Sequence, residues 1–121
     1  MNLESNIVDL SFLSKFTKGD KNKMRYFIEM YLRTAPPLFG EMEDQFAIWN
    51  NNEIYARAHS LKPQCAYVGI IGLKELLVEI ENAAKENLDK GILQGLIQKA
   101  IELNNRGMVE LNTYLKAEEV A

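Results

Sequence analysis

His59 is the only histidine of the chain and lies in the segment Ala58-His59-Ser60-Leu61-Lys62. Spacings of three, four and three residues place four residues on one face of an α-helix: His59, Lys62, Ala66 and Gly69. A neutral imidazole is a nucleophile, and a lysine one turn away can balance negative charge on a phosphorylated product. The small residues beyond it leave room for another protein to approach. This pattern indicates a phosphoacceptor histidine that receives its phosphoryl group from a docking partner.

Small side chains surround the imidazole on the helical wheel, and we predict that they form the docking surface: Ala56, Pro63, Ala66 and Gly69. His59 falls about a quarter turn from the apolar stripe of its helix, so we expect it to be partly exposed. We expect an arginine at Gly69 to block docking by bulk without changing stability. The nearby acidic residues Glu79, Glu81 and Glu86 are interpreted as a solvated face, and no second acid–base residue is expected beside His59.

Simpler interpretations apply to several of these residues. A His-x-x-Lys pair on a helix occurs often by chance, and Lys62 alone would be a solvated charge. Ser60 cannot form a catalytic triad with its neighbour, because adjacent helical side chains diverge. Cys65 belongs to the apolar stripe and is expected to be inert core. A di-iron bundle site would require two Glu-x-x-His pairs, and this chain has one histidine.

Helical spacing of apolar residues extends over most of the chain. Asp9 is predicted to cap a short helix through about Phe16. The following helices are expected over residues 20–49, with a kink or pause at Pro36-Pro37, and over 53–69, 73–87 and 89–115. Residues 50–52 are predicted to form a turn, and residues 116–121 to fray. We therefore expect an all-α, antiparallel up-down-up-down four-helix bundle with a short N-terminal helix packed across one end.

Composition limits the classes of function. The 121 residues suit a single domain, 1–121, and a formal net charge of −3 without a basic stripe argues against nucleic acid. A single cysteine gives no intramolecular disulfide. No apolar run approaches the length of a membrane span, and residues 1–6 do not resemble a signal peptide. A cytoplasmic location without membrane contact is expected.

The segment from His59 to Gly69 resembles the signature of histidine-containing phosphotransfer (HPt) domains. The family pattern has lysine three residues after the histidine and glycine four and ten residues after it. Lys62 and Gly69 match, whereas Pro63 replaces the first glycine. The resemblance implies a four-helix bundle with no catalytic activity and no cofactor of its own. His59 would be the phosphoacceptor, Lys62 would stabilise the phosphoryl charge, and Ala66 and Gly69 would be small docking positions.

The partners implied by the resemblance are response-regulator receiver domains, including that of a hybrid histidine kinase, with magnesium bound by the receiver only. A monomeric phosphorelay intermediate is the leading hypothesis. The alternative is a binding-only helical adaptor that docks receivers without transfer, for which Pro63 is the sequence support. A histidine-kinase dimerisation domain is a weaker alternative, because it dimerises through two helices and requires an attached ATP domain. The sequence does not identify the cognate kinase, the regulator or the direction of phosphoryl flow.

Overall fold

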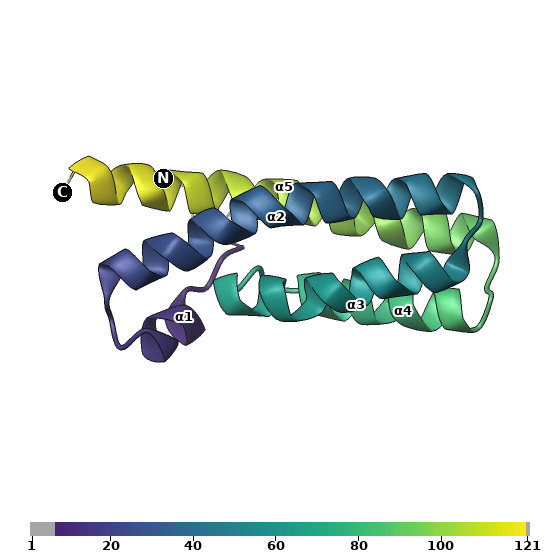
Figure 1. The fold of residues 1–121 in the computed structure, drawn as a ribbon, viewed down its shortest axis with the longest axis horizontal. Helices are drawn as coiled ribbons and strands as arrows, with labels where there is room; N and C mark the ends of the chain where they lie inside the picture. The colour runs from purple at the N-terminus through teal and green to yellow at the C-terminus, as the bar shows by residue number, and fades with distance from the viewer. Residues whose placement is uncertain (1–6, 121) are drawn as a thin grey trace.

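The computed structural model describes residues 7–120, and it contains five helices within that range. They are α1 (Ser11–Phe16), α2 (Lys21–Ala47), α3 (Asn51–Val68), α4 (Leu73–Lys85) and α5 (Lys90–Val120). Helices α2 to α5 each pack against the next helix along the chain, and α5 returns against α2. This is the predicted up-down-up-down bundle. The short helix α1 contacts α3 and lies beside one end of the bundle (Figure 1).

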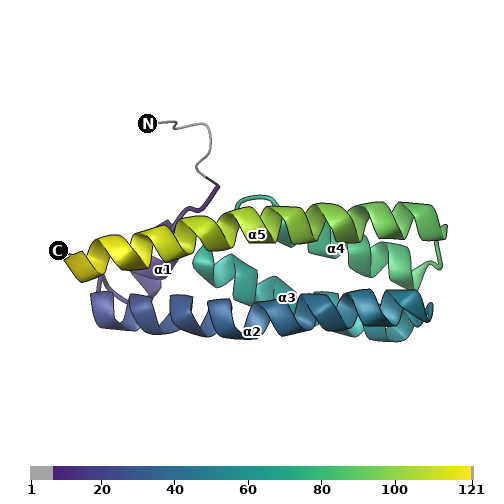
Figure 2. The same cartoon turned by 90° about the horizontal axis from the view of Figure 1, so that it is seen from above.

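Helices α2 and α5 are much longer than α3 and α4, so they continue together beyond the other pair (Figure 2). The Arg25 guanidinium donates to the Leu115 carbonyl oxygen at 3.1 Å in this projecting part. Lys21 Nζ lies 2.6 Å from Glu118 Oε1. These contacts accompany continued helix through Val120, so the expectation that residues 116–120 fray is wrong. Ala121 lies outside the described residues. Residues 1–6, which were predicted not to be a signal peptide, also lie outside them.

The prediction of a pause at Pro36-Pro37 is also wrong, because α2 continues through both prolines. Both rings are exposed, so the carbonyl oxygens that lose a backbone partner face the solvent side of the helix. Ala35 and Phe39 are buried on the opposite side and pack into the core before and after the prolines. Packing on both sides therefore holds the helix together across the two missing N–H groups.

The helix ends follow local backbone chemistry. The Asp20 carboxylate accepts the Asn22 and Lys23 amides at the start of α2, as predicted. Asn50 caps α3, which begins at Asn51, so the turn between α2 and α3 covers residues 48–50 rather than the predicted 50–52. Asp9 accepts the Ser11 amide, but the N-cap residue of α1 is Leu10, so the predicted Asp9 cap lies one residue before that position. The caps at Asp20 and Asn50 fix where α2 and α3 begin.

Residues 7–10 run across the turn between α3 and α4. The Asp9 amide donates to the Gly69 carbonyl at 2.8 Å, and the Ile71 amide donates to the Ile7 carbonyl at 2.8 Å. The Glu110 carboxylate of α5 accepts the amides of Ile7 and Val8. We call residues 7–10 the N-terminal strap, and it ties α1 to the end of the bundle.

Candidate functional site

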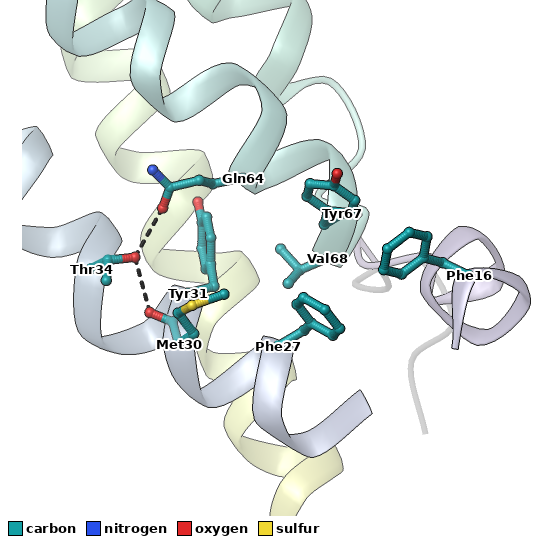
Figure 3. Close-up of a pocket in the computed structure, with 8 residues that line it drawn as sticks. All are labelled: Phe16, Phe27, Met30, Tyr31, Thr34, Gln64, Tyr67 and Val68. Atoms are coloured by element: carbon teal, nitrogen blue, oxygen red, sulfur yellow. Dashed lines mark hydrogen bonds between the residues drawn. The ribbon is translucent and has the colours of Figure 1, made fainter. Parts of the chain in front are cut away.

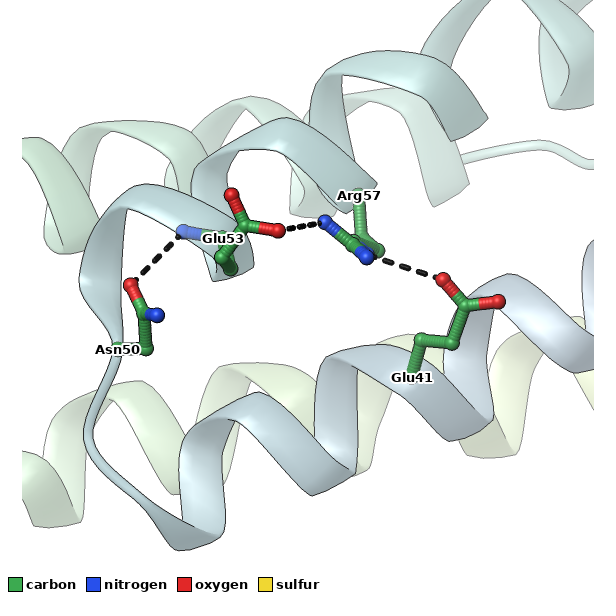
Figure 4. A network of polar contacts seen from close by, with 4 residues as sticks. All are labelled: Glu41, Asn50, Glu53 and Arg57. Atoms are coloured by element: carbon green, nitrogen blue, oxygen red, sulfur yellow. Dashed lines mark hydrogen bonds and ion pairs between the residues drawn. The ribbon is translucent and has the colours of Figure 1, made fainter.

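Helix α3 carries the predicted phosphoacceptor, and its apolar stripe fixes the orientation of the helix. All five residues of the predicted stripe are buried: Ile54, Ala58, Leu61, Cys65 and Val68. Arg57 reaches the other way, to Glu53 on its own helix and to Glu41 on α2, where its Nε is 3.1 Å from Oε1 (Figure 4). The buried stripe and the Arg57 ion pairs together fix the rotation of α3, and the face that carries His59 points to solvent.

The His59 side chain is 63% exposed, as predicted for a position beside the buried stripe. The Tyr55 ring stacks on the imidazole one turn earlier, with centroids 5.9 Å apart and an interplanar angle of 8°. Nδ1 lies 2.8 Å from Glu81 Oε2 on α4. The other ring nitrogen, Nε2, is therefore the one left for an incoming group.

Glu81 is buried, with 5% of its surface exposed, so its assignment to a solvated face is wrong. The expectation that no further acid–base residue lies beside His59 is also wrong. Lys62 Nζ lies 2.8 Å from Glu81 Oε1, so one carboxylate holds the imidazole through one oxygen and the ammonium through the other. The sequence contained a signal for the burial of Glu81. Glu81 follows the buried Leu77 by four residues, which places both on the core side of α4.

The structure brings part of the predicted docking set to the surface around His59. Pro63 and Ala66 are exposed and Ala56 is partly exposed. Pro63 lies inside α3, which continues from Asn51 to Val68. The proline therefore does not end the helix that carries His59.

Gly69 ends α3, as the sequence predicted, and it also packs against the N-terminal strap, which the sequence did not indicate. Its backbone is left-handed, with φ of 71°. A Cβ atom at this position would lie 1.8 Å from the carbonyl oxygen of Asp9 in the N-terminal strap. The expectation that arginine at Gly69 leaves stability unchanged is therefore wrong, because any side chain displaces the strap.

An apolar pocket of about 330 Å³ opens between α1, α2 and α3 (Figure 3). Phe16, Phe27 and Tyr67 lie on one side of it, and their rings contact one another at centroid distances of 5.4 to 6.2 Å. On the other side, the Thr34 hydroxyl lies 2.9 Å from Gln64 Oε1. Tyr67 follows His59 by eight residues, which is about 12 Å along a helix axis. The sequence did not predict this pocket.

The Hpt domain family model matches residues 27–117, which is most of the chain. The chain therefore belongs to the histidine-containing phosphotransfer domain family. Hpt domains take part in histidine phosphotransfer in two-component phosphorelays and interact with response-regulator receiver domains. No curated protein and no solved structure matches the chain. Over residues 7–120, none of the helices combines the length and the apolar character needed to cross a membrane.

Proposed function

We propose that His59 accepts a phosphoryl group from the phospho-aspartate of one receiver domain and passes it to the aspartate of another. The observation that carries this proposal is the exposed imidazole, whose Nδ1 is engaged by Glu81 while Nε2 is left for the reaction. In the first step the Nε2 lone pair forms a P–N bond and the P–O bond to the aspartate breaks. The bonding electrons return to the aspartate carboxylate.

The remaining chemistry is divided between the two proteins. Lys62 is the cation beside His59, and an ammonium has three N–H donors, of which one serves Glu81. The others can reach the oxygens of a phosphoryl group. The receiver would supply magnesium and the aspartate, so this chain acts as a monomeric carrier without catalysis of its own.

The docking surface centres on His59 and includes Ala56, Pro63 and Ala66. A stable interface covers about 800 Å² on each partner, which corresponds to a circle with a radius of about 16 Å. A receiver that places its aspartate at His59 therefore also covers Tyr67 and the mouth of the apolar pocket. Gly69 contributes to this surface by holding the strap and α1 in place.

The docking proposal is tested by bulk at the interface. Ala66→Trp is expected to weaken receiver binding at least tenfold, since the indole would occupy the space that the receiver needs. Ala117→Trp is the matched control, because Ala117 is exposed on α5, whereas His59 and Ala66 lie on α3. Normal binding by Ala66→Trp would place the interface elsewhere on the bundle.

Transfer itself separates the carrier from the binding-only adaptor. The wild-type protein is expected to take label from a phosphorylated receiver, and Pro63→Gly is expected to do so within about tenfold of that rate, or ~1.4 kcal/mol in barrier. The adaptor hypothesis predicts receiver binding without label in the wild type and a gain of transfer in Pro63→Gly. An inactive wild type with an active glycine variant would therefore reject the carrier function.

A further inference from the structure

The Tyr55 ring lies nearly parallel to the His59 imidazole, one helical turn before it on α3. The two ring centroids are 5.9 Å apart and the interplanar angle is 8°, which is an offset-stacked arrangement. Residues four apart share a helix face, and helical side chains lean toward the N-terminal end of the helix. His59 therefore leans toward the turn that carries Tyr55. Tyr55 is partly buried and packs against the core, which holds its ring in this place.

Phosphorylation changes the charge of the ring that faces Tyr55. Before the reaction Nδ1 of His59 carries the proton, since it lies 2.8 Å from the Glu81 carboxylate. When the Nε2 lone pair forms the P–N bond and the P–O bond to the aspartate breaks, that proton stays on Nδ1. The product is a phosphoimidazolium, whose ring carries a delocalised positive charge. The face of an aromatic ring attracts a cation within about 6 Å of its centroid, and the Tyr55 centroid lies within this range.

We propose that Tyr55 stabilises the phosphorylated form of His59 through a cation–π contact with the phosphoimidazolium ring; this inference rests on the proposed function. The contact is stronger with the charged ring than with the neutral one, so it favours the phosphoryl group on His59 over the same group on the receiver aspartate. Lys62 follows His59 by one turn, where its ammonium can reach the negative phosphoryl oxygens. Tyr55 and Lys62 thus stabilise the two opposite charges of one product.

The expected effect is on an equilibrium, which separates it from docking. Once transfer between His59 and a receiver aspartate has reached equilibrium, the equilibrium constant depends on the stability of the two phosphorylated forms and not on how tightly the proteins dock. A cation–π contact at an exposed site corresponds to about two- to fivefold in an equilibrium constant. Loss of the Tyr55 ring should therefore shift the phosphoryl group away from His59 by this factor.

Three replacements of Tyr55 separate its ring face from its bulk and its hydroxyl. Tyr55→Phe removes the hydroxyl, and Tyr55→Leu removes the ring but keeps an apolar side chain. Pentafluorophenylalanine at position 55 nearly keeps the shape of phenylalanine, but its fluorine atoms withdraw electrons and reverse the charge of the ring face. Tyr26→Leu is the matched control, because Tyr26 is 58% exposed on α2 and its ring contacts Phe27. Thermal unfolding shows whether each protein folds, and if Tyr55→Leu does not, the comparison of the two phenylalanines decides.

The first readout is the equilibrium distribution of a labelled phosphoryl group between this chain and a receiver. We expect Tyr55→Phe and Tyr26→Leu to match the wild type. In Tyr55→Leu the equilibrium constant for phosphorylation of His59 is expected to be about two- to fivefold smaller, and pentafluorophenylalanine to lower it at least as much. Equal constants for phenylalanine and pentafluorophenylalanine would overturn the proposal, because these proteins differ in the charge of the ring face. A loss in Tyr55→Phe as large as that in Tyr55→Leu would assign the effect to the hydroxyl and overturn it as well.

The second readout is the lifetime of the phosphohistidine after labelling with phosphoramidate, a small donor that needs no receiver. Hydrolysis breaks the P–N bond, returns its electrons to Nε2 and removes the positive charge of the ring. Loss of the cation–π contact should therefore shorten the lifetime in Tyr55→Leu and in the pentafluorophenylalanine protein, and unchanged lifetimes in both would contradict the proposal. A wild type that is labelled by phosphoramidate but by no receiver would reject the proposed carrier function, while the lifetimes would still decide the role of Tyr55. A wild type labelled by neither donor would reject both.

Discussion

Replacing Gly69 with alanine tests how the end of α3 is held beside the N-terminal strap. The added Cβ would lie 1.8 Å from the Asp9 carbonyl oxygen and 2.8 Å from its carbonyl carbon, so the strap has to move. The movement disrupts two backbone hydrogen bonds of 2.8 Å, from the Asp9 amide to Gly69 and from the Ile71 amide to Ile7.

The size of the effect follows from these terms. A left-handed conformation costs a non-glycine residue about 1–2 kcal/mol, and each lost hydrogen bond costs about 0.5–1.5 kcal/mol. Gly69→Ala should therefore lower the free energy of unfolding by about 2–5 kcal/mol. For a domain of this size the unfolding midpoint falls by roughly 5–20 °C.

Thermal and urea unfolding followed by circular dichroism measure this change. Gly95→Ala in α5 is the matched control, because a Cβ there meets no atom within 4 Å. It should leave stability unchanged or raise it by up to about 1 kcal/mol. If Gly69→Ala unfolds within about 0.5 kcal/mol of the wild type, a value below the cost of one lost hydrogen bond, the strap is not packed against Gly69. Because a Gly69 variant also loses folding stability, weaker receiver binding by such a variant would not by itself show that Gly69 lies in the interface.

Three further substitutions or treatments follow from the contacts around the core. Lys62→Ala should slow transfer by up to about tenfold and lower stability by about 1–3 kcal/mol, because buried Glu81 loses one partner; unchanged transfer and unfolding would reduce Lys62 to a surface charge. Burial raises the pKa of the Cys65 thiol to about 12, so alkylation at pH 8 should be slow until urea unfolds the chain. Because the unfolded thiol loses its proton first, stability should fall as the pH rises above about 9, and a flat profile from pH 9 to 10.5 would contradict this. Tyr31→Phe should cost about 1–3 kcal/mol, since the buried Asn104 side chain loses the hydroxyl that donates to it; equal unfolding midpoints would refute it.

The sequence was sufficient for features that depend on periodicity. The apolar stripe of α3 follows helical spacing, so the burial of Ile54 and Leu61 and the exposure of His59 could be predicted together. The Asp20 cap and the end of α3 at Gly69 also depend on local residue preferences. These features are set within one helix or one turn, where spacing carries the information.

Features that depend on contacts between distant segments were missed. Glu81 was assigned to solvent because its helix is rich in acidic residues, although its burial is set by packing of α4 against α3. The clash at Gly69 involves Asp9, which is far away in the sequence. Pro36 was expected to interrupt α2, but packing on the opposite side of the helix outweighs the lost backbone bond. Tertiary contacts decided each of these cases, and local propensity did not.

The central claim is that His59 carries the phosphoryl group, and the most direct test is to locate the label. The wild-type protein is incubated with a phosphorylated receiver, and the modified residue is identified by mass spectrometry and by its acid-labile, base-stable chemistry. We predict a single phosphoryl group on His59 and none in His59→Gln, which should remain folded because the imidazole is largely exposed. A label that persists in folded His59→Gln would contradict the assignment, as would a folded wild type that binds the receiver and takes no label.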